Sequence, residues 1–409
     1  MTRRILALST YPIAKPRHGG QLRVSALQDF YRALGHTFEC AAVYTAPYGP
    51  GTVGPNDIKL GFVGSRWTDT PFVTDLASGR FAAENPAAYA HFSGLVARQR
   101  PDVIQLEQPF LWPLVKRLRA EGKLDGVSIV YSSHNWEGPL KEALLLNAGI
   151  SATKAAEFRA EIEAMETELA GASDIIIAVS AEEAKVYAAM ETSARILLAP
   201  NGTSRPPGRL VESKAKAEFG DAPFMFFVGS AYPPNSEGFI DLVATGGFYF
   251  LPPHKRLAVC GGASDAIFSH PEYQRFLGAN SQRVHFFPDL GDEDLWAVKA
   301  SAHAFLLPIK FGGGTNLKSA EALASGKWVI ATSTALRGLD RFLDAPGVIV
   351  ADTPAAFRKA AIKVMGSPAL KLTKAERDAR DTVYWDRALA LSGLGQAIGE
   401  ARTPVPSRA

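Results

Sequence analysis

The sequence has few of the features that mark secreted, membrane-spanning or nucleic-acid-binding proteins. Only two cysteines occur among its 409 residues, and Cys40 and Cys260 each lie in an apolar, strand-like run far from the other. This usage predicts buried thiols in a reducing compartment and argues against disulfides or a metal site. No run approaches the ~18–20 apolar residues of a membrane helix. The net charge of +3 is mild, and no basic block with interleaved aromatic residues indicates nucleic acid.

Several catalytic motifs are also missing. The chain has no G-x-S-x-G elbow, no Walker lysine loop, no zinc-ligand spacing and no protein-kinase motif set. The paired glycines at 261–262 lack the G-x-G-x-x-G spacing of a dinucleotide site. The common hydrolase, P-loop, kinase and dehydrogenase patterns therefore have no support in this sequence.

What the sequence does have is a regular alternation of short apolar runs and longer helical stretches. Continuous apolar strands separated by helices imply parallel sheets that are covered on both faces. Together with the length of the chain, this predicts an α/β protein of two Rossmann-like, doubly wound domains. The expected strands are 5–8, 38–43, 103–106, 129–131, 175–179 and 196–198 in the first half, and 224–228, 257–259, 284–287, 304–307, 329–331 and 348–350 in the second.

The domain boundary is expected at a polar, proline-rich segment, NGTSRPPGRLVES at 201–213. We place an N-terminal domain at 1–204 and a C-terminal domain at 205–384. The mainly helical tail 385–409 is expected to cross back onto the first domain. The chain begins MTRRILALSTYP, but its apolar run is too short for a signal peptide and is predicted to be the first strand.

The most informative segment is FGGGTNLKSAEALASGKWVI at 311–330. Three consecutive glycines, 312–314, allow a ligand to approach the backbone closely. Thr315 is the predicted N-cap of the helix that follows, whose free N–H groups and dipole suit a phosphate. Lys318 adds a point charge, and Glu321 lies on nearly the same face at i+3, where it could accept hydrogen bonds from sugar or ribose hydroxyls. The segment therefore predicts a nucleotide-sugar site.

Polar residues also follow the predicted strands of the first half, at the edge where doubly wound sheets bind ligands. His134 either satisfies the end of its strand or hydrogen-bonds a sugar hydroxyl. Glu107 is either a base or the partner of Arg17 or Arg23. Gly20, after Gly19, either forms a tight turn or brings the backbone close to a phosphate or sugar.

One acidic cluster resembles the carboxylates that hold a divalent metal in some sugar transferases. It is Asp292-Glu293-Asp294. Because it precedes the apolar run 295–297, we predict the N-terminus of a helix with an acidic first turn instead.

Four segments carry a recognisable pattern: ASDIIIAVSAEEAKVY with Asp174 and Ser180, LLAPNGTS with a Pro-Asn-Gly turn at 200–202, FVGSAYPPNSEGF, and LPIKFGGGTNLKSAEALASGKWVIATS. Together they resemble the GT-B glycosyltransferases, and within them glycosyltransferase family 4, over nearly the whole length. The resemblance implies two Rossmann-like domains that face each other across a cleft. It also implies transfer of a sugar from a nucleotide diphosphate sugar with retention, without a bound metal.

The chain departs from the family pattern at two places. In the E-x7-E motif of the family, the second Glu binds the ribose and is Glu321 here, whereas the first would fall on Gly313. The family also often carries an Arg and a Lys after the glycine of the second domain's first strand, Gly229. Those two positions are Ser230 and Asn235 here.

Without that Arg/Lys pair, the backbone N–H groups of Gly313, Gly314 and Thr315 must make more of the contacts that bind the diphosphate. Lys318, helped by Lys310, would stabilise the leaving charge. The residues expected to bind the donor are Gly20, Gly229, Ser230, Asn235, Gly313, Gly314, Thr315, Asn316, Lys318 and Glu321. The residues expected to act in catalysis are His134, Lys318 and Glu107.

The resemblance implies a front-face displacement in which the leaving phosphate accepts the acceptor's proton. The nucleotide diphosphate sugar is a co-substrate, and neither a bound cofactor nor a metal is expected. The acceptor would be a glycan, a lipid-linked molecule or a small molecule, in cell-surface polysaccharide or glycoconjugate synthesis. We expect a cytoplasmic protein with peripheral contact at the inner membrane face and no nucleic-acid partner.

Two other functions fit the same fold. A sugar-nucleotide epimerase needs acid/base carboxylates around the sugar, for which only Glu107 and Glu137 are candidates. A non-catalytic GT-B protein that binds a sugar nucleotide or a partner would fit the loss of two family positions. Conversion of a donor without an acceptor would favour the epimerase, and nucleotide binding without turnover would favour the binding protein.

Overall fold

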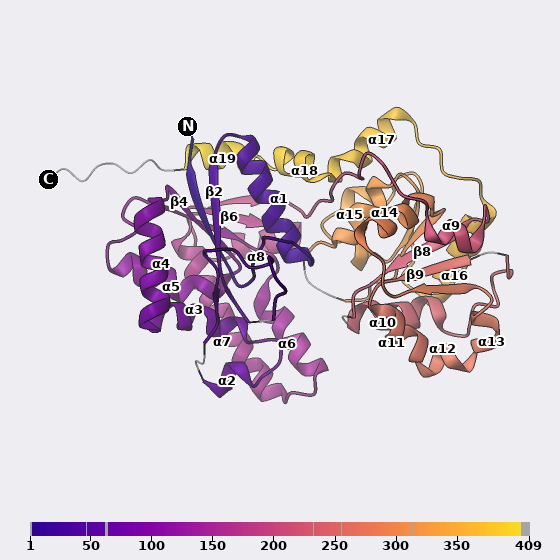
Figure 1. Cartoon of the computed structure of the whole chain (residues 1–409), viewed down its shortest axis with the longest axis horizontal. Coiled ribbons are helices and arrows are strands. Elements are labelled where there is room, and N and C mark those ends of the chain that lie inside the picture. Colours follow the sequence, from indigo (N-terminus) through magenta and orange to yellow (C-terminus); the bar gives the residue numbers. More distant parts are fainter. Residues whose placement is uncertain are drawn as a thin grey trace. The chain divides into compact units, whose positions relative to one another are not determined.

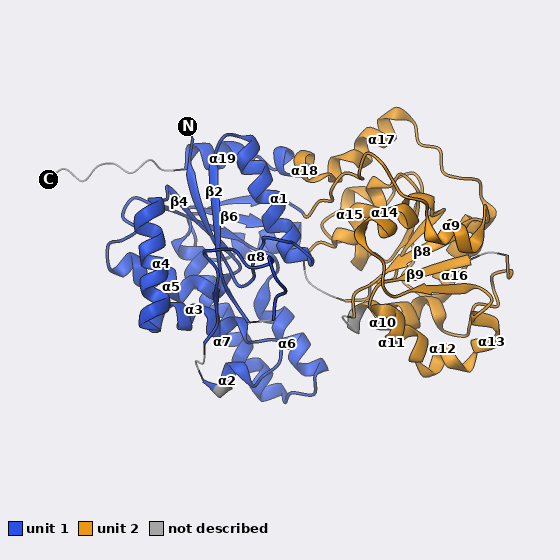
Figure 2. Cartoon of the chain, viewed as in Figure 1, with its two compact units in different colours: residues 1–200, 388–409 blue, residues 201–387 orange. Residues whose placement is uncertain are grey.

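The protein divides into two compact units, which Figure 2 shows in different colours. The computed structural model describes residues 2–45, 47–61, 64–231, 233–254, 256–311 and 314–401. Unit 1 consists of 1–200 and 388–409, and unit 2 of 201–387. The boundaries expected from the sequence, after residues 204 and 384, lie close to these.

Unit 1 contains a seven-stranded parallel sheet in the order β3-β2-β1-β4-β5-β6-β7. Strand β1 pairs in parallel with β2 on one side and β4 on the other, with Ile5 opposite Phe38 and Val103. The strands are β1 (Arg4–Ser9), β2 (Thr37–Tyr44), β3 (Ile58–Lys59), β4 (Val103–Glu107), β5 (Ser128–Ser132), β6 (Ile175–Ala178) and β7 (Arg195–Leu198).

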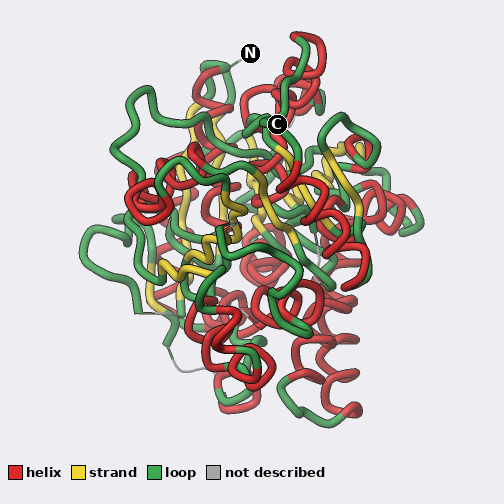
Figure 3. The backbone as a smooth tube through the Cα atoms, turned by 90° about the vertical axis from the view of Figure 1, so that its right-hand side faces the viewer, coloured by secondary structure: helices red, strands yellow, loops and turns green. Residues whose placement is uncertain are grey.

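The helices of unit 1 connect these parallel strands, and the strands (yellow) run among helices (red) in Figure 3. They are α1 (Gly19–Ala33), α2 (Ser65–Thr68), α3 (Asp75–Glu84), α4 (Pro86–Gln99), α5 (Trp112–Ala120), α6 (Glu137–Asn147), α7 (Ala152–Ala172), α8 (Ala181–Ala188) and α19 (Leu394–Glu400). Helix α18 (Trp385–Leu391) spans the boundary between the units.

Unit 2 contains a six-stranded parallel sheet in the order β10-β9-β8-β11-β12-β13, which is the strand order of a Rossmann fold. The order reverses between β8 and β11, so ligands are expected beyond the carboxyl ends of these two strands. The strands are β8 (Phe224–Val228), β9 (Arg256–Cys260), β10 (Val284–Phe287), β11 (Ala304–Leu307), β12 (Trp328–Ala331) and β13 (Val348–Val350).

The helices of unit 2 connect its strands or flank the first and the last of them in the sequence (Figure 1). They are α9 (Lys214–Phe219), α10 (Pro233–Phe239), α11 (Ala263–Ser269), α12 (Pro271–Arg275), α13 (Leu277–Asn280), α14 (Asp292–Ser301), α15 (Leu317–Ala324), α16 (Pro354–Gly366) and α17 (Lys374–Arg380). The π-helical segment Ile240–Ala244 extends α10.

The core of unit 2 explains why its strands are continuously apolar. Met225 and Phe227 of β8 belong to one buried cluster, and Phe224 and Phe226 of the same strand belong to another. Successive side chains of a strand point to opposite faces, so both faces of this sheet are covered. The predicted parallel sheets, and all twelve predicted strands, are confirmed.

One strand was missed. The edge strand β3 has only two residues, Ile58 and Lys59, and neither is buried. A segment this short cannot show the alternation or the apolar run by which strands are recognised in a sequence.

The described end of the C-terminal tail packs within unit 1. The Arg3 guanidinium donates a hydrogen bond of 3.1 Å to the carbonyl oxygen of Gly399, and Arg195 pairs with Glu400 at 3.1 Å. Helix α19 also lies against Phe30 and Leu34 near the end of α1.

The two thiols are both free, and they differ in burial. Cys260 is fully buried at the end of β9, and burial raises the pKa of its thiol to about 12. Cys40 is half-buried in β2. None of the helices in the described part of the chain is long and apolar enough to cross a membrane.

Candidate functional site

The loop between β11 and α15 carries the predicted phosphate cradle. Gly312 and Gly313 lie outside the described residues. Gly314 has φ of +58°, a left-handed conformation that favours glycine, and its carbonyl oxygen accepts a 2.9 Å hydrogen bond from Arg337 Nε. Sequence reasoning did not single out Arg337, which brings a guanidinium beside this loop.

Thr315 is not the N-cap that we predicted. The N-cap of α15 is Asn316, whose side chain makes no capping hydrogen bond. The Thr315 hydroxyl instead accepts a 2.9 Å hydrogen bond from the backbone N–H of Asn201, and the Thr315 carbonyl accepts another from Asn201 Nδ2 at 2.9 Å. The Pro-Asn-Gly turn that begins unit 2 therefore holds the loop, and the first N–H groups of α15 keep no intrahelical partner.

Lys318 reaches from the first turn of α15 to α10. Its ammonium donates a 2.6 Å hydrogen bond to Asn235 Oδ1, and Asn235 Nδ2 donates at 3.1 Å to both the carbonyl and the hydroxyl oxygen of Ser230. The three polar residues thus form one chain across the ends of β8 and β11. Burial lowers the pKa of Lys318 to about 8, and nearby Glu321 opposes that shift.

Glycines allow α10 to pack closely against the chain that follows β8 and β11. A Cβ atom at Gly229 would lie 3.0 Å from the Cβ of Asn235 and 2.8 Å from that of Ala263. A Cβ at Gly238 would lie 2.0 Å from the Pro308 carbonyl oxygen, at the end of β11. Side chains at these two positions would clash with their neighbours, so the close packing of α10 requires glycine at both. That packing places Asn235 within reach of Lys318.

Glu321 turns away from Lys318 and pairs with a residue that sequence reasoning missed. Its Oε1 accepts an ion-paired hydrogen bond from Lys299 Nζ of α14, and the two side chains are only 18% and 11% exposed. The Lys299 ammonium also lies 4.9 Å from the ring centroid of Trp296. The sequence did offer a signal, because Trp296 and Lys299 are spaced i, i+3 and share a helix face.

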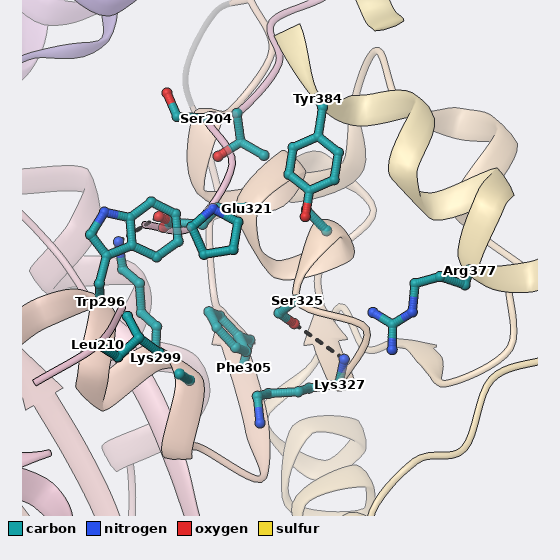
Figure 4. Close-up of a pocket in the computed structure, with 14 residues that line it drawn as sticks. Ser204, Leu210, Trp296, Lys299, Phe305, Glu321, Ser325, Lys327, Arg377 and Tyr384 are labelled. Atoms are coloured by element: carbon teal, nitrogen blue, oxygen red, sulfur yellow. Dashed lines mark hydrogen bonds and ion pairs between the residues drawn. The ribbon is translucent and has the colours of Figure 1, made fainter. Parts of the chain in front are cut away.

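The Lys299–Glu321 pair lies in the wall of a cavity of about 360 Å³ within unit 2 (Figure 4). Aromatic and apolar side chains form most of the wall, and charged groups enter it at separate points (Figure 4). The residues around it come from the segment 203–210, α14, β11, α15 with the turn that follows it, α17 and the chain before α18. This volume falls within the usual range for small-molecule pockets.

Lys310 does not join this group. Its ammonium pairs at 2.5 Å with Asp241, and the two side chains are about half exposed. A surface pair of this kind contributes little energy. The positive charge near the start of α15 comes instead from the Lys318 ammonium and from the Arg337 guanidinium beside Gly314.

The acidic run 292–294 forms the first turn of α14, as predicted. Carboxylates there complement the positive end of the helix dipole. In the described ranges, no group of three His, Cys, Asp or Glu side chains is arranged to hold a metal ion.

In unit 1, the two predicted catalytic residues are bonded to each other. His134 Nε2 lies 3.0 Å from Glu107 Oε2, and His134 Nδ1 lies 2.9 Å from the Tyr11 hydroxyl. Glu107 also accepts from Gln105 Nε2. All of these side chains are buried, and burial together with the Glu107 charge raises the pKa of Tyr11 well above its usual value. Both ring nitrogens of His134 are therefore already used by the protein.

Gly20 and Arg23 lie beside this cluster, at the start of α1. A Cβ at Gly20 would lie 2.4 Å from the Tyr11 hydroxyl oxygen, so close packing against Tyr11 accounts for glycine at this position. Arg23 is fully buried and donates a 3.0 Å hydrogen bond to the Ala199 carbonyl. Burial lowers its pKa, and the charge of Glu107 opposes that effect.

Glu137, the second carboxylate considered for acid/base chemistry, is also tied within unit 1. Its Oε1 accepts 3.2 Å hydrogen bonds from Gln108 Nε2 and Asn135 Nδ2. Behind it, Glu166 accepts from the backbone N–H groups of Glu137 and Gly138, and burial raises the pKa of Glu166 to about 8. These contacts hold the β5–α6 loop in place.

Comparison with known proteins agrees with this architecture. Residues 222–367 match the family model described as "Glycosyl transferases group 1". No curated protein sequence matches the chain. The fold is that of GT-B proteins, as the resemblance implied, and the matches support the likeness to GT-B glycosyltransferases.

Three solved structures illustrate the likeness. Sucrose-phosphate synthase from Thermosynechococcus elongatus has a TM-score of 0.71 at 18% identity, covering 98% of this chain and 100% of that one. HepE of Anabaena, solved with UDP and glucose, has a TM-score of 0.58 at 15% identity over 97% and 98%. A putative UDP-N-acetylglucosamine 2-epimerase from Listeria monocytogenes has 0.55 at 11% identity over 98% and 99%.

Proposed function

We propose that this protein is a retaining glycosyltransferase of family 4, which moves a sugar from a nucleotide diphosphate sugar to a carbohydrate, lipid-linked or small-molecule acceptor. One observation carries the proposal. The Lys318 ammonium donates to Asn235, which in turn donates to Ser230, and these are the two positions at which the family often has a lysine and an arginine. A positive charge that the resemblance gives to α10 is supplied from α15 instead.

This arrangement suits the departure of a nucleoside diphosphate. The N–H groups at the start of α15 and the helix dipole favour an anion, and Lys318 adds a full charge beside them. Because Lys318 is largely removed from water, its charge acts on a bound diphosphate more strongly than an exposed lysine would. Charge stabilisation of this kind removes the need for a bound metal.

In this proposal Glu321 accepts hydrogen bonds from the ribose, with Gly314, Thr315 and Asn316 around the diphosphate. Unit 1 serves the acceptor and the transferred sugar through the loop at Gly20. The hydrogen bonds that His134 and Glu107 make favour a structural role for both residues, in which they hold the loop at Gly20 in place. The leaving phosphate then accepts the proton of the acceptor hydroxyl, which requires no free carboxylate base.

The epimerase alternative is less well supported by the geometry. Its fold resembles that of the Listeria protein, but at 11% identity the likeness concerns the fold alone. Glu107 is bonded to His134 and Glu137 to Gln108 and Asn135, so neither carboxylate is free to exchange a proton with a sugar. Turnover of a sugar nucleotide without any acceptor would favour the epimerase.

The proposal is tested by thermal shift with uridine, guanosine, adenosine and thymidine diphosphates and their sugars. A nucleotide that binds the native protein stabilises it by mass action and so raises its melting temperature. At a nucleotide concentration of a hundred times the Kd, the free energy of unfolding rises by about 2.7 kcal/mol. We expect one base to stand out, with a smaller shift in Lys318→Ala. No shift with any of these nucleotides would contradict the proposal.

A further inference from the structure

Helices α14 and α15 bring two lysines and one carboxylate together beside the proposed diphosphate site. Lys318 and Glu321 stand three residues apart on α15, the spacing at which lysine and glutamate side chains commonly pair. Lys299 approaches from α14. One carboxylate can neutralise only one of the two ammonium groups fully, so the choice of partner decides which lysine keeps its charge.

The structure shows which partner Glu321 takes. Its Oε1 is ion-paired with Lys299, and both side chains are mostly withdrawn from water. Lys318 instead donates to the uncharged amide oxygen of Asn235. Trp296 lies against the Lys299 ammonium at 4.9 Å and helps to fix it by a cation–π contact.

This pairing has an electrostatic consequence for an anionic ligand. A Glu321 carboxylate paired with Lys318 would cancel the charge that is meant for the diphosphate and would add its own repulsion. Held by Lys299, the carboxylate is neutralised on the α14 side. Its second oxygen, Oε2, accepts no hydrogen bond from any described residue and remains available to a hydroxyl group.

We propose that Lys299 is a positioning residue that holds Glu321 away from Lys318, so that one helix presents an ammonium to the diphosphate and a carboxylate oxygen to the ribose. The inference rests on the proposed function and deepens it. It assigns to α14 a part in donor recognition that neither the sequence pattern nor the family likeness provides.

The test uses the nucleoside diphosphate that gives the largest thermal shift with the wild-type protein, and its monophosphate, both titrated by calorimetry. In Lys299→Met the freed carboxylate is expected to turn to Lys318. Affinity for the diphosphate should then fall about tenfold, and affinity for the monophosphate clearly less, because the lost charge acts on the added phosphate. Lys299→Arg keeps the pair and should bind the diphosphate within about twofold of wild type.

A double variant separates this role from simple support of the fold. In the Glu321→Gln background there is no carboxylate for Lys299 to hold away from Lys318. Adding Lys299→Met should therefore change diphosphate affinity less than twofold. An equal tenfold loss in both backgrounds would overturn the inference, as would unchanged affinity in Lys299→Met alone. If Lys299→Met does not fold, Lys299→Gln takes its place in the same comparison.

Failure of the proposed function has a different signature. It would appear as no binding of any nucleoside diphosphate to the wild-type protein, before any variant is made. Failure of this inference alone would appear as normal wild-type binding that depends on Lys318 and Glu321 but is indifferent to Lys299.

Discussion

The polar groups at the strand ends of the two units are arranged in opposite ways. In unit 1, His134 and Glu107 bond to each other, to Tyr11 and to Gln105, all of them buried. In unit 2, the Lys318 ammonium donates to the uncharged amide oxygen of Asn235, and no carboxylate among the described residues is hydrogen-bonded to it. Polar side chains at the ends of parallel strands thus have two kinds of partner, which distinguish a closed network in unit 1 from the lysine that we propose binds an anion in unit 2.

The largest expected effect comes from removing the Lys318 ammonium. Lys318→Ala should lower kcat about 10²–10³-fold, as loss of one preorganised donor to developing charge does. Lys310→Ala is the matched control, because Lys310 is a nearby lysine that pairs with Asp241 on the surface, and it should stay within twofold of wild type. Steady-state kinetics with a saturating donor measures kcat for both variants. A rise in KM with unchanged kcat would exclude a role in departure of the diphosphate.

The lowered pKa of Lys318 predicts that use of the donor depends on pH. The ammonium is present below pH about 8 and is lost above it, since burial lowers its pKa to about 8. Because the charged form is the active one, kcat/KM for the donor should fall about tenfold between pH 7 and pH 9. Lys318→Arg retains its charge, so its profile should stay flat over this range. A wild-type profile that is equally flat would contradict the assignment.

Glu321→Ala should weaken nucleotide binding by about tenfold, the usual cost of losing a charged hydrogen-bond acceptor. Calorimetry with the nucleoside diphosphate measures it directly. Glu293→Ala provides a comparison, because that carboxylate is exposed in the first turn of α14 and lies outside the proposed site. Equal affinities of the two variants would remove Glu321 from the donor site.

The smallest effect on donor binding is expected in unit 1. His134→Ala removes one hydrogen-bond partner from Glu107 and one from Tyr11 and should lower the free energy of unfolding by about 1–3 kcal/mol. Nucleotide affinity should change less than twofold. Urea unfolding and calorimetry measure the two quantities, with His254→Ala, an exposed histidine of unit 2, as the control. A large loss of affinity at unchanged stability would instead give His134 a direct role at the donor.

The fold could be predicted because its signals are local. Every strand with three or more buried or half-buried apolar residues was recognisable, and only β3, which has two residues, was missed. The helix at Asp292 was recognisable from its acidic first turn. These features depend only on residues that are neighbours in the sequence, so a single sequence is enough to recognise them.

The site was only partly predictable, because its contacts join distant segments. The glycine-rich segment predicted Lys318 and Glu321 as site residues, but their partners Asn235 and Lys299 lie on other helices. Thr315 has the side chain of an N-cap, yet its hydroxyl bonds to Asn201, more than a hundred residues earlier. His134 was expected to touch a sugar, and nothing in the sequence shows that Tyr11 and Glu107 occupy both of its nitrogens.

The most direct test of the account is the titration of Lys318 itself. The ammonium can be followed by NMR of lysine labelled at Cε with ¹³C, with its signal assigned by comparison with Lys318→Arg. We predict a pKa of about 8 in the free protein. A saturating nucleoside diphosphate should move that pKa back towards the ordinary lysine value of ~10.4, because the bound anion favours the charged form. A pKa that the nucleotide leaves unchanged would contradict the claim that Lys318 holds the diphosphate.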